Sequence, residues 1–63
     1  MKVYIEKENK HVDTQASSGK ELLKSLKINP SAVILVRNNE VILEDETLNE
    51  KDDIKILSVI SGG

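Results

Sequence analysis

The chain has 63 residues and a mass of 7.0 kDa, a size that allows one domain with a small core. It has no cysteine and one histidine, His11, which excludes disulfides, iron–sulfur clusters and zinc-thiolate sites and argues against a histidine metal site. A formal charge of −2 and a pI near 5.3 lack the basic excess typical of nucleic-acid-binding proteins. Without a signal-like beginning or an apolar stretch of about 20 residues, we expect a cytoplasmic protein that does not bind membranes.

The first part of the chain predicts a hairpin of two strands. Residues 1–6 alternate between apolar and polar side chains, which is typical of a half-buried strand. The side chains predicted to face the core are Met1, Val3 and Ile5. A polar turn over residues 7–10 leads into a weaker strand over residues 11–15, where Val12 points inward. A strand with so few apolar residues suits the edge of a sheet.

A short helix is predicted next. Ser18 and Glu21 form a capping-box pattern, in which the serine oxygen accepts the amide of Glu21 and the glutamate reaches back to the cap amide. Three leucines follow on one helical stripe: Leu22, Leu23 and Leu26. Burial of each is worth about 1.5–3 kcal/mol. Asn29-Pro30 disfavours further helix, because the residue before a proline is pushed out of the helical region. We therefore predict a helix over residues 19–27.

The second half of the chain predicts three more strands. The apolar run over residues 32–36 lacks alternation, which suits a central strand covered on both faces. Asn38-Asn39 tolerates the positive φ angles of a tight turn, so residues 41–43 return as a strand. An acidic connection follows, with Leu48 as its buried anchor.

The last strand, over residues 54–60, is strongly apolar and should also be central. The predicted elements therefore follow the order strand, strand, helix, strand, strand, strand. A right-handed crossover after the first hairpin would lay the helix across one face of the sheet. This is an α+β fold, with residues 1–60 as a single domain and residues 61–63 as a flexible tail.

This element order, together with the ending Leu57-Ser58-Val59-Ile60-Ser61-Gly62-Gly63, resembles the β-grasp fold of ubiquitin-like proteins over the whole chain. The resemblance is greatest to the small archaeal modifier proteins and to the sulfur carriers of thiamine and molybdopterin synthesis. The residues that favour the archaeal modifiers are Asn29-Pro30-Ser31, Val33-Ile34-Leu35-Val36, Asn38-Asn39 and Glu44-Asp45. The fold implies the strand order 2-1-5-3-4, which places the two most apolar strands in the middle.

The resemblance assigns the chemistry to Gly62 and Gly63. It implies that a ubiquitin-activating-type enzyme uses ATP to adenylate the carboxylate of Gly63. The adenylate would then receive sulfur from a donor as a thiocarboxylate, for tRNA thiolation, or form an isopeptide bond with protein lysines. Residues without a Cβ atom allow the backbone to lie in a narrow channel against the nucleotide. The chain itself would be a carrier, with no catalytic residue, no metal and no bound cofactor.

The sheet face that the helix leaves open predicts a docking surface. Leu57 and Val59 are expected to point outward there. The residues expected to point mainly inward are Ile54, Ile56 and Ile60. They would be joined by one alternate pair from the third strand, either Val33 and Leu35 or Ile34 and Val36. The resemblance supports docking through this face, and the alternative is ordinary surface aliphatic residues. Among the eight lysines, Lys55 beside this face is the candidate acceptor for conjugation.

Other interpretations remain open at this point. The acidic residues of the segment over residues 44–53 could steer a basic partner, but a solvated loop is the favoured interpretation. A sulfur carrier for thiamine thiazole synthesis is close behind the archaeal modifier. The molybdopterin synthase subunit ranks lower, because the proline-containing approach to Gly-Gly usual in that family is replaced here by Leu57-Ser58-Val59-Ile60. From a different class, a plain β-grasp interaction module with an inert tail is the alternative.

Overall fold

The structure, a computed structural model, describes residues 1–59. The predicted tail and its Gly62-Gly63 pair, with Ile60, lie outside these residues. The elements follow one another as β1 (Lys2–Ile5), the 3-10 helix η1 (Glu6–Glu8), β2 (Lys10–Asp13), α1 (Gly19–Ser25), the 3-10 helix η2 (Pro30–Ala32), β3 (Val33–Arg37), β4 (Glu40–Ile42) and β5 (Asp53–Ser58).

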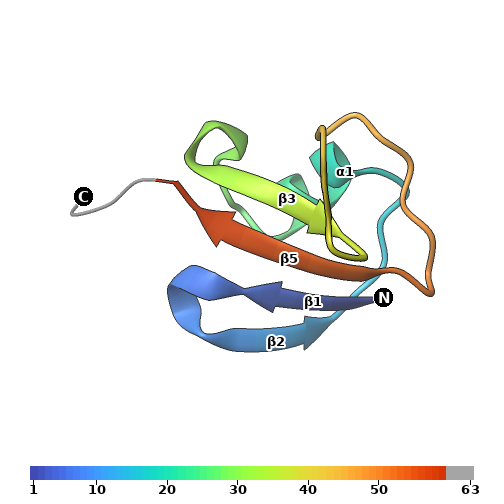
Figure 1. Ribbon diagram of the computed structural model, residues 1–63, viewed down its shortest axis with the longest axis horizontal. Helices are drawn as coiled ribbons and strands as arrows, with labels where there is room; N and C mark the ends of the chain where they lie inside the picture. The colour runs from blue at the N-terminus through green and yellow to red at the C-terminus, as the bar shows by residue number, and fades with distance from the viewer. Residues whose placement is uncertain (60–63) are drawn as a thin grey trace.

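The strands of residues 1–59 form one mixed sheet in the order β2-β1-β5-β3-β4. β1 and β5 run parallel, and every other neighbouring pair is antiparallel. Helix α1 lies on one side of this sheet, behind β3 and β5 in Figure 1. The predicted α+β class and strand order are thus confirmed, including the central positions of β3 and β5 and the edge position of the polar strand β2.

The core lies between α1 and the covered face of the sheet, and strand alternation supplies most of it. Its buried side chains are Met1, Val3, Ile5, Leu22, Leu23, Leu35, Ile42, Leu48, Ile54 and Ile56. The predicted inward set of the first strand is therefore confirmed, as are Ile54 and Ile56 of the last, while Ile60 lies outside the described residues. Leu48 is the buried anchor of the long connection. Each such aliphatic side chain contributes about 1.5–3 kcal/mol by leaving water.

The prediction that the third strand is covered on both faces is wrong. Only Leu35 of β3 is buried, while Ile34 is 39% exposed and Val36 is half-buried. The described helix α1 covers one face of the sheet, so alternate side chains of β3 point to the uncovered face. The apolar composition of β3 is therefore not a sign that both of its faces are buried. Its outward residues form part of an open apolar surface.

The N-terminus of α1 is hydrogen-bonded to the long connection between β4 and β5. Ser18 caps the helix as predicted, with its Oγ accepting the amide of Glu21 at 3.2 Å. The Glu21 carboxylate accepts the hydroxyl of Ser17 at 2.7 Å, where the prediction had it reaching the cap amide. The amides of Gly19 and Lys20 donate to carbonyls of the connection, those of Glu46 and Glu44 respectively, so this helix end is satisfied by backbone.

Gly19 permits this close approach. A Cβ atom at this position would lie 2.5 Å from Leu35 Cδ1 and 3.0 Å from the carbonyl oxygen of Glu44. A side chain at residue 19 would therefore push the helix away from β3 and from the connection.

The helix ends two residues earlier than predicted, at Ser25 rather than at residue 27. Lys27 adopts a left-handed conformation with φ of 60°, and the amide of Ile28 donates to the carbonyl of Leu23 at 2.9 Å. The amide of Lys27 donates to the carbonyl of Lys24 at 3.2 Å, which completes a Schellman motif. Asn29-Pro30 therefore does not end the helix: Asn29 caps η2 instead, accepting the amide of Ser31 at 3.0 Å.

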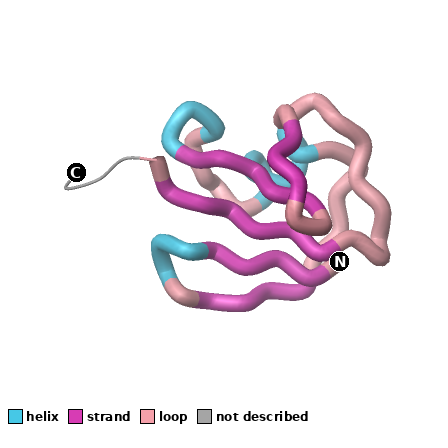
Figure 2. The backbone as a smooth tube through the Cα atoms, in the orientation of Figure 1, coloured by secondary structure: helices cyan, strands magenta, loops and turns pink. Residues whose placement is uncertain are grey.

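The β3–β4 hairpin turns on Asn38 and Asn39, as predicted. Both residues have positive φ angles, 50° and 72°, and Arg37 pairs with Glu40 across the turn. Positive φ at both central positions is the requirement of a type I′ hairpin turn, and asparagine tolerates it. The tube view in Figure 2 shows this tight turn beside the long connection that follows β4.

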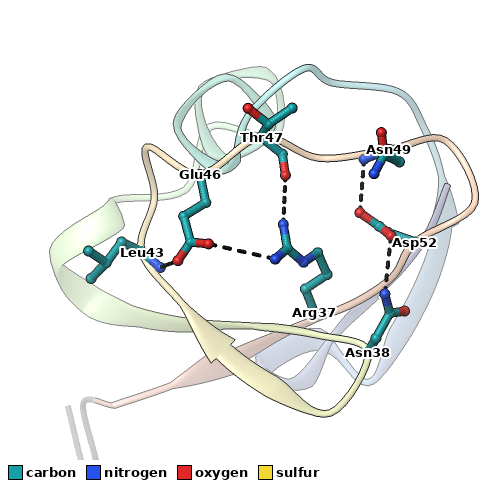
Figure 3. Close-up of polar contacts among 7 residues, drawn as sticks. All are labelled: Arg37, Asn38, Leu43, Glu46, Thr47, Asn49 and Asp52. Carbon is teal, nitrogen blue, oxygen red and sulfur yellow. Dashed lines mark hydrogen bonds and ion pairs between the residues drawn. The ribbon is translucent and has the colours of Figure 1, made fainter.

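Polar side chains fix the long connection to the hairpin (Figure 3). Arg37 Nη1 donates to the carbonyl of Thr47 at 2.7 Å, and Nη2 lies 3.6 Å from the carboxylate of Glu46. The other oxygen of Glu46 accepts the amide of Leu43 at 3.0 Å. One part of the predicted acidic run therefore holds the connection in place.

Asp52 corrects the interpretation of that run as a solvated loop. It is 8% exposed, and its carboxylate accepts the amide of Asn49 at 2.8 Å and the side-chain amide of Asn38 at 3.1 Å. The backbone hydrogen bond from Asn49 is the main reason that the pKa of Asp52 is lowered below its ordinary 3.8. Burial opposes this lowering of the pKa, while Asn38 and the positive charge of Arg37 add to it.

Candidate functional site

The predicted site residues are distributed over the end of β5 and the uncovered face of the sheet. Gly62 and Gly63 lie beyond the described residues, and Val59 is the last residue of the described chain. Leu57 is half-buried, Val59 is 46% exposed and Lys55 is exposed. The geometry of the candidate site can therefore be built from the point where β5 ends and from the surface beside it.

The end of β5 is held from both sides. The amide of Ser58 donates to Oε1 of Glu6 at 3.0 Å, and the amide of Val59 donates to the carbonyl of Ala32 at 3.1 Å. Glu6 belongs to η1 and Ala32 to η2, and Figure 2 shows these two short helices on either side of the end of β5. The last two described residues thus have hydrogen-bond partners on neighbouring chain segments from opposite flanks.

The register of β3 on β5 selects between the two alternate pairs left open by the sequence. Ile34 pairs with Leu57, and Leu35 pairs with the fully buried Ile56. Directly paired residues of antiparallel strands lie on the same face, so Ile34 joins Leu57 on the open side. Val36 lies on that side as well, and Val33 and Leu35 face the helix side. Together with Val59, the residues Ile34, Val36 and Leu57 form what we call the apolar patch.

Val41 of the edge strand β4 pairs with Val36, so it lies on this face too, and it is 73% exposed. The half of the open face formed by β1 and β2 is polar. The Tyr4 and His11 rings lie on neighbouring strands with their centroids 4.7 Å apart, and the Tyr4 hydroxyl donates to Oδ1 of Asn9 at 2.8 Å. Lys55 pairs with Tyr4 on one side and with Val36 on the other. Lys55 therefore stands at the boundary between the apolar patch and the polar half of the face.

Neither a metal cluster nor a membrane-spanning helix is found in the part of the chain that the structure describes. Among residues 1–59, His, Asp and Glu side chains do not gather in a group of three or more suited to a metal ion. Helix α1, with seven residues, is far shorter than a membrane span needs.

Comparison with known proteins agrees with this fold. The sequence profile of the ThiS family matches residues 2–63. The chain belongs to the ThiS family. It is also 35% identical over 57 residues to the protein named sulfur carrier protein TtuB of Thermus thermophilus, an alignment that covers 89% of this chain and 88% of that relative. The resemblance to ubiquitin-like sulfur carriers drawn from the sequence is thereby confirmed.

The ThiS family match extends over the Gly62-Gly63 pair as well as over the described domain. In this ThiS-family chain, the structure adds one residue at the end of β5 that sequence analysis missed. In the sequence, Glu6 ends the alternation of the first strand and resembles an ordinary surface carboxylate. Its hydrogen-bond partner, the amide of Ser58, lies 52 residues away in the sequence. A sequence pattern confined to neighbouring residues contains no signal for such a pair.

Proposed function

We propose that this protein is a sulfur carrier in which the carboxylate of Gly63 is activated and then loaded with sulfur. The ThiS family match, which runs through residue 63, carries this proposal. The relative named as a sulfur carrier supports it, since the two chains align over most of their lengths. In this function the chain supplies a reactive carboxylate and a docking surface, and a partner enzyme supplies the catalysis.

The proposed chemistry has two steps. An oxygen of the Gly63 carboxylate attacks the α-phosphate of ATP, which forms an acyl adenylate and releases pyrophosphate. A hydrosulfide-level sulfur donor then attacks the acyl carbon, so that a C–S bond replaces the C–O bond to AMP. The products are a thiocarboxylate on Gly63 and free AMP. ATP is thus consumed by the activating enzyme and is not a bound cofactor of the carrier.

We propose that the apolar patch docks the activating enzyme. Leu57 lies beside Ile34 on the uncovered face. Leu57 is one residue before the end of β5 at Ser58, so both side chains lie near the end of this strand. A partner seated on these side chains is therefore close to the residues that lead to Gly63. Apolar side chains gathered on an exposed face are typical of protein interfaces.

For the destination of the sulfur, we infer tRNA uridine, together with isopeptide attachment of the same activated carboxylate to protein lysines. The resemblance to the archaeal modifiers supports both uses, which need the same acyl activation. Thiamine thiazole synthesis is the alternative, and the ThiS family match is the observation that favours it. Deleting the gene separates these uses: loss of thiouridine in tRNA supports the first, and a requirement for added thiamine supports the alternative.

Lys55 is the proposed acceptor when a second copy of the protein is the target. It is exposed and adjoins the apolar patch through Val36. Peptide mapping of conjugates from cells tests this assignment. A Gly-Gly remnant on Lys55 supports it, while conjugates that leave Lys55 unmodified and use other lysines contradict it.

The central experiment is intact mass spectrometry of the protein after incubation with ATP, sulfide and the activating enzyme of the source organism. We expect a mass increase equal to the difference between sulfur and oxygen, localised to Gly63. A variant lacking Gly62 and Gly63, and another with one alanine added after Gly63, should stay unchanged while melting at the temperature of the native protein. An unmodified native chain, with an enzyme that loads another carrier under the same conditions, would support the interaction-module alternative.

A further inference from the structure

Glu6 occupies a special place in the sheet, directly after the last residue of β1. β1 and β5 run parallel and pair up to Ile5 and Ile56. At Glu6 the chain turns away into η1, which is closed by a hydrogen bond from the amide of Asn9 to the carbonyl of Glu6 at 3.1 Å. The pairing of β1 with β5 therefore ends at Ile56, two residues before β5 ends at Ser58.

The side chain of Glu6 takes over the pairing with β5 at the point where the backbone of β1 no longer pairs with it. Its Oε1 accepts the amide of Ser58 at 3.0 Å, on the flank of β5 where β1 lies. A hydrogen bond to an ionised carboxylate is stronger than one between neutral groups. The asparagine at position 9, with φ of 49°, adopts the left-handed conformation that closes this turn and directs the chain into β2.

The opposite flank of β5 is held one residue later. The amide of Val59 donates to the carbonyl of Ala32 at 3.1 Å, in η2 before β3. Successive amides of an extended chain point to opposite sides, so these two contacts hold Ser58 and Val59 from both neighbours. These two contacts fix the backbone at Ser58 and Val59, the last two described residues.

We propose that Glu6 is a positioning residue for the activation of Gly63. The four residues after Val59 span at most about 14 Å, so the direction of the chain at Ser58 and Val59 limits where the Gly63 carboxylate can lie. A partner that docks on the apolar patch meets this carboxylate in a productive place only if the chain leaves the sheet in one direction. This inference rests on the proposed function, and it assigns Glu6 an effect on the adenylation step through Ser58.

The test compares three variants in the complete chain. Glu6→Ala removes the acceptor, and Glu6→Gln keeps an oxygen in the same place without the charge. Glu8→Ala removes an equal charge from the same η1 and serves as the matched control. Two measurements are made on each: hydrogen exchange of the Ser58 amide by NMR, and steady-state adenylation by the activating enzyme with the carrier as the varied substrate.

We expect Glu6→Ala to exchange the Ser58 amide several-fold faster than the native protein. Its kcat for adenylation should fall about tenfold, because the reacting carboxylate is misplaced, while KM stays within about twofold because the apolar patch is intact. Glu6→Gln should recover most of kcat, and Glu8→Ala should match the native protein in both measurements.

Each contrary result has a separate meaning. Native kcat in Glu6→Ala, with or without faster exchange at Ser58, overturns the positioning role and leaves the carrier function intact. Equal losses of kcat in Glu6→Ala and Glu8→Ala overturn it too, since they would reflect the charge of η1 rather than this contact. Failure of the native protein to be adenylated, by an enzyme that activates another carrier, overturns the carrier function and the role of Glu6 with it.

Discussion

The two ends of the sheet both use a carboxylate that accepts a backbone amide, but with different surroundings. At the loop end, which comprises residues 43–52 and the β3–β4 hairpin, Asp52 is buried and held by Asn49 and Asn38. At the tail end, which comprises the end of β5 with η1 and η2, Glu6 is exposed and holds a single amide of Ser58. The loop end holds the long connection against the hairpin, whereas we propose that the tail end directs the residues that carry the activated carboxylate.

This comparison makes opposite predictions for the two ends. Substitutions of the side chains that hold the loop end together should lower the stability of the fold and leave activation unchanged wherever the protein stays folded. Substitutions of Glu6 and of the apolar patch should lower activation and leave stability unchanged. Paired variants, one at each end, therefore sharpen or break the distinction.

The largest effect is expected from Leu57→Asp, which places a charge in the apolar patch. We expect kcat/KM for adenylation to fall by about thirtyfold or more, the size of a loss of about 2 kcal/mol at an interface hot spot. Leu43→Asp makes the same change at an exposed leucine of the loop end and should react like the native protein. Equal adenylation of both variants would remove the apolar patch from the docking surface.

Gly19→Ala, at the contact between α1 and the loop end, should produce the largest loss of stability. The new methyl group would meet Leu35 and the backbone of Glu44, so the helix start and the connection must separate. We expect the free energy of unfolding, measured by urea denaturation, to fall by about 1–2 kcal/mol after allowing for the better helix propensity of alanine. Lys20→Ala, at the next and exposed position, is the control. An unchanged midpoint in Gly19→Ala would show that the contact adjusts freely.

Arg37→Met tests the polar contacts that hold the connection while keeping most of the aliphatic stem. It removes the hydrogen bond to Thr47 and the ion pair with Glu46. We expect a loss of about 1 kcal/mol in unfolding free energy, because a partly exposed pair adds little to one hydrogen bond. Lys51→Met removes the same charge from an exposed position of the same connection and should change stability by less than about 0.5 kcal/mol. Reduced adenylation in Arg37→Met at native-like stability would break the separation of the two ends.

The smallest expected effect is a difference in how stability changes with pH, and it arises from the ionisation of Asp52 in acid. Its pKa in the folded protein is below the ordinary 3.8, so its charged form stabilises the fold above that value. This contribution is lost as the pH falls through the folded pKa. We expect the melting temperature of Asp52→Asn to decline less than that of the native protein between about pH 5 and pH 2. Asp45→Asn, an exposed carboxylate of the same connection, is the control, and an equally flat profile there would contradict the assignment to Asp52.

Much of the architecture follows from local pattern. The alternation of Met1, Val3 and Ile5 predicts a one-sided strand, and Asn38-Asn39 predicts the type I′ turn that the structure contains. The hydrophobic run of the last strand predicts its central position in the sheet. These predictions succeed because side-chain period and turn conformation depend on residues that are neighbours in the chain.

The errors in prediction have two causes: a local motif that lacks its usual residue, and an environment that other parts of the chain decide. The helix ends at Ser25 because Lys27 and Ile28 bond back to its last turn, a motif usually marked by glycine, which is absent here. β3 is apolar on both faces although α1 covers one of them, so composition overstated its burial. The acidic run around Asp52 predicts a solvated carboxylate. The side chain is buried instead, and it accepts a hydrogen bond from Asn38 of the β3–β4 hairpin, 14 residues away in the sequence.

The sequence by itself determined the order of the elements, the Asn38-Asn39 turn, the inward residues of the first and last strands in the chain and the family resemblance, because each depends on residues close together in the chain. Only the tertiary structure decided that Ile34 rather than Leu35 stands beside Leu57 on the open face, since a shift of one residue in the β3–β5 register exchanges the two faces. It also joined Glu6 to Ser58 across 52 residues, because parallel pairing of β1 with β5 brings their ends together.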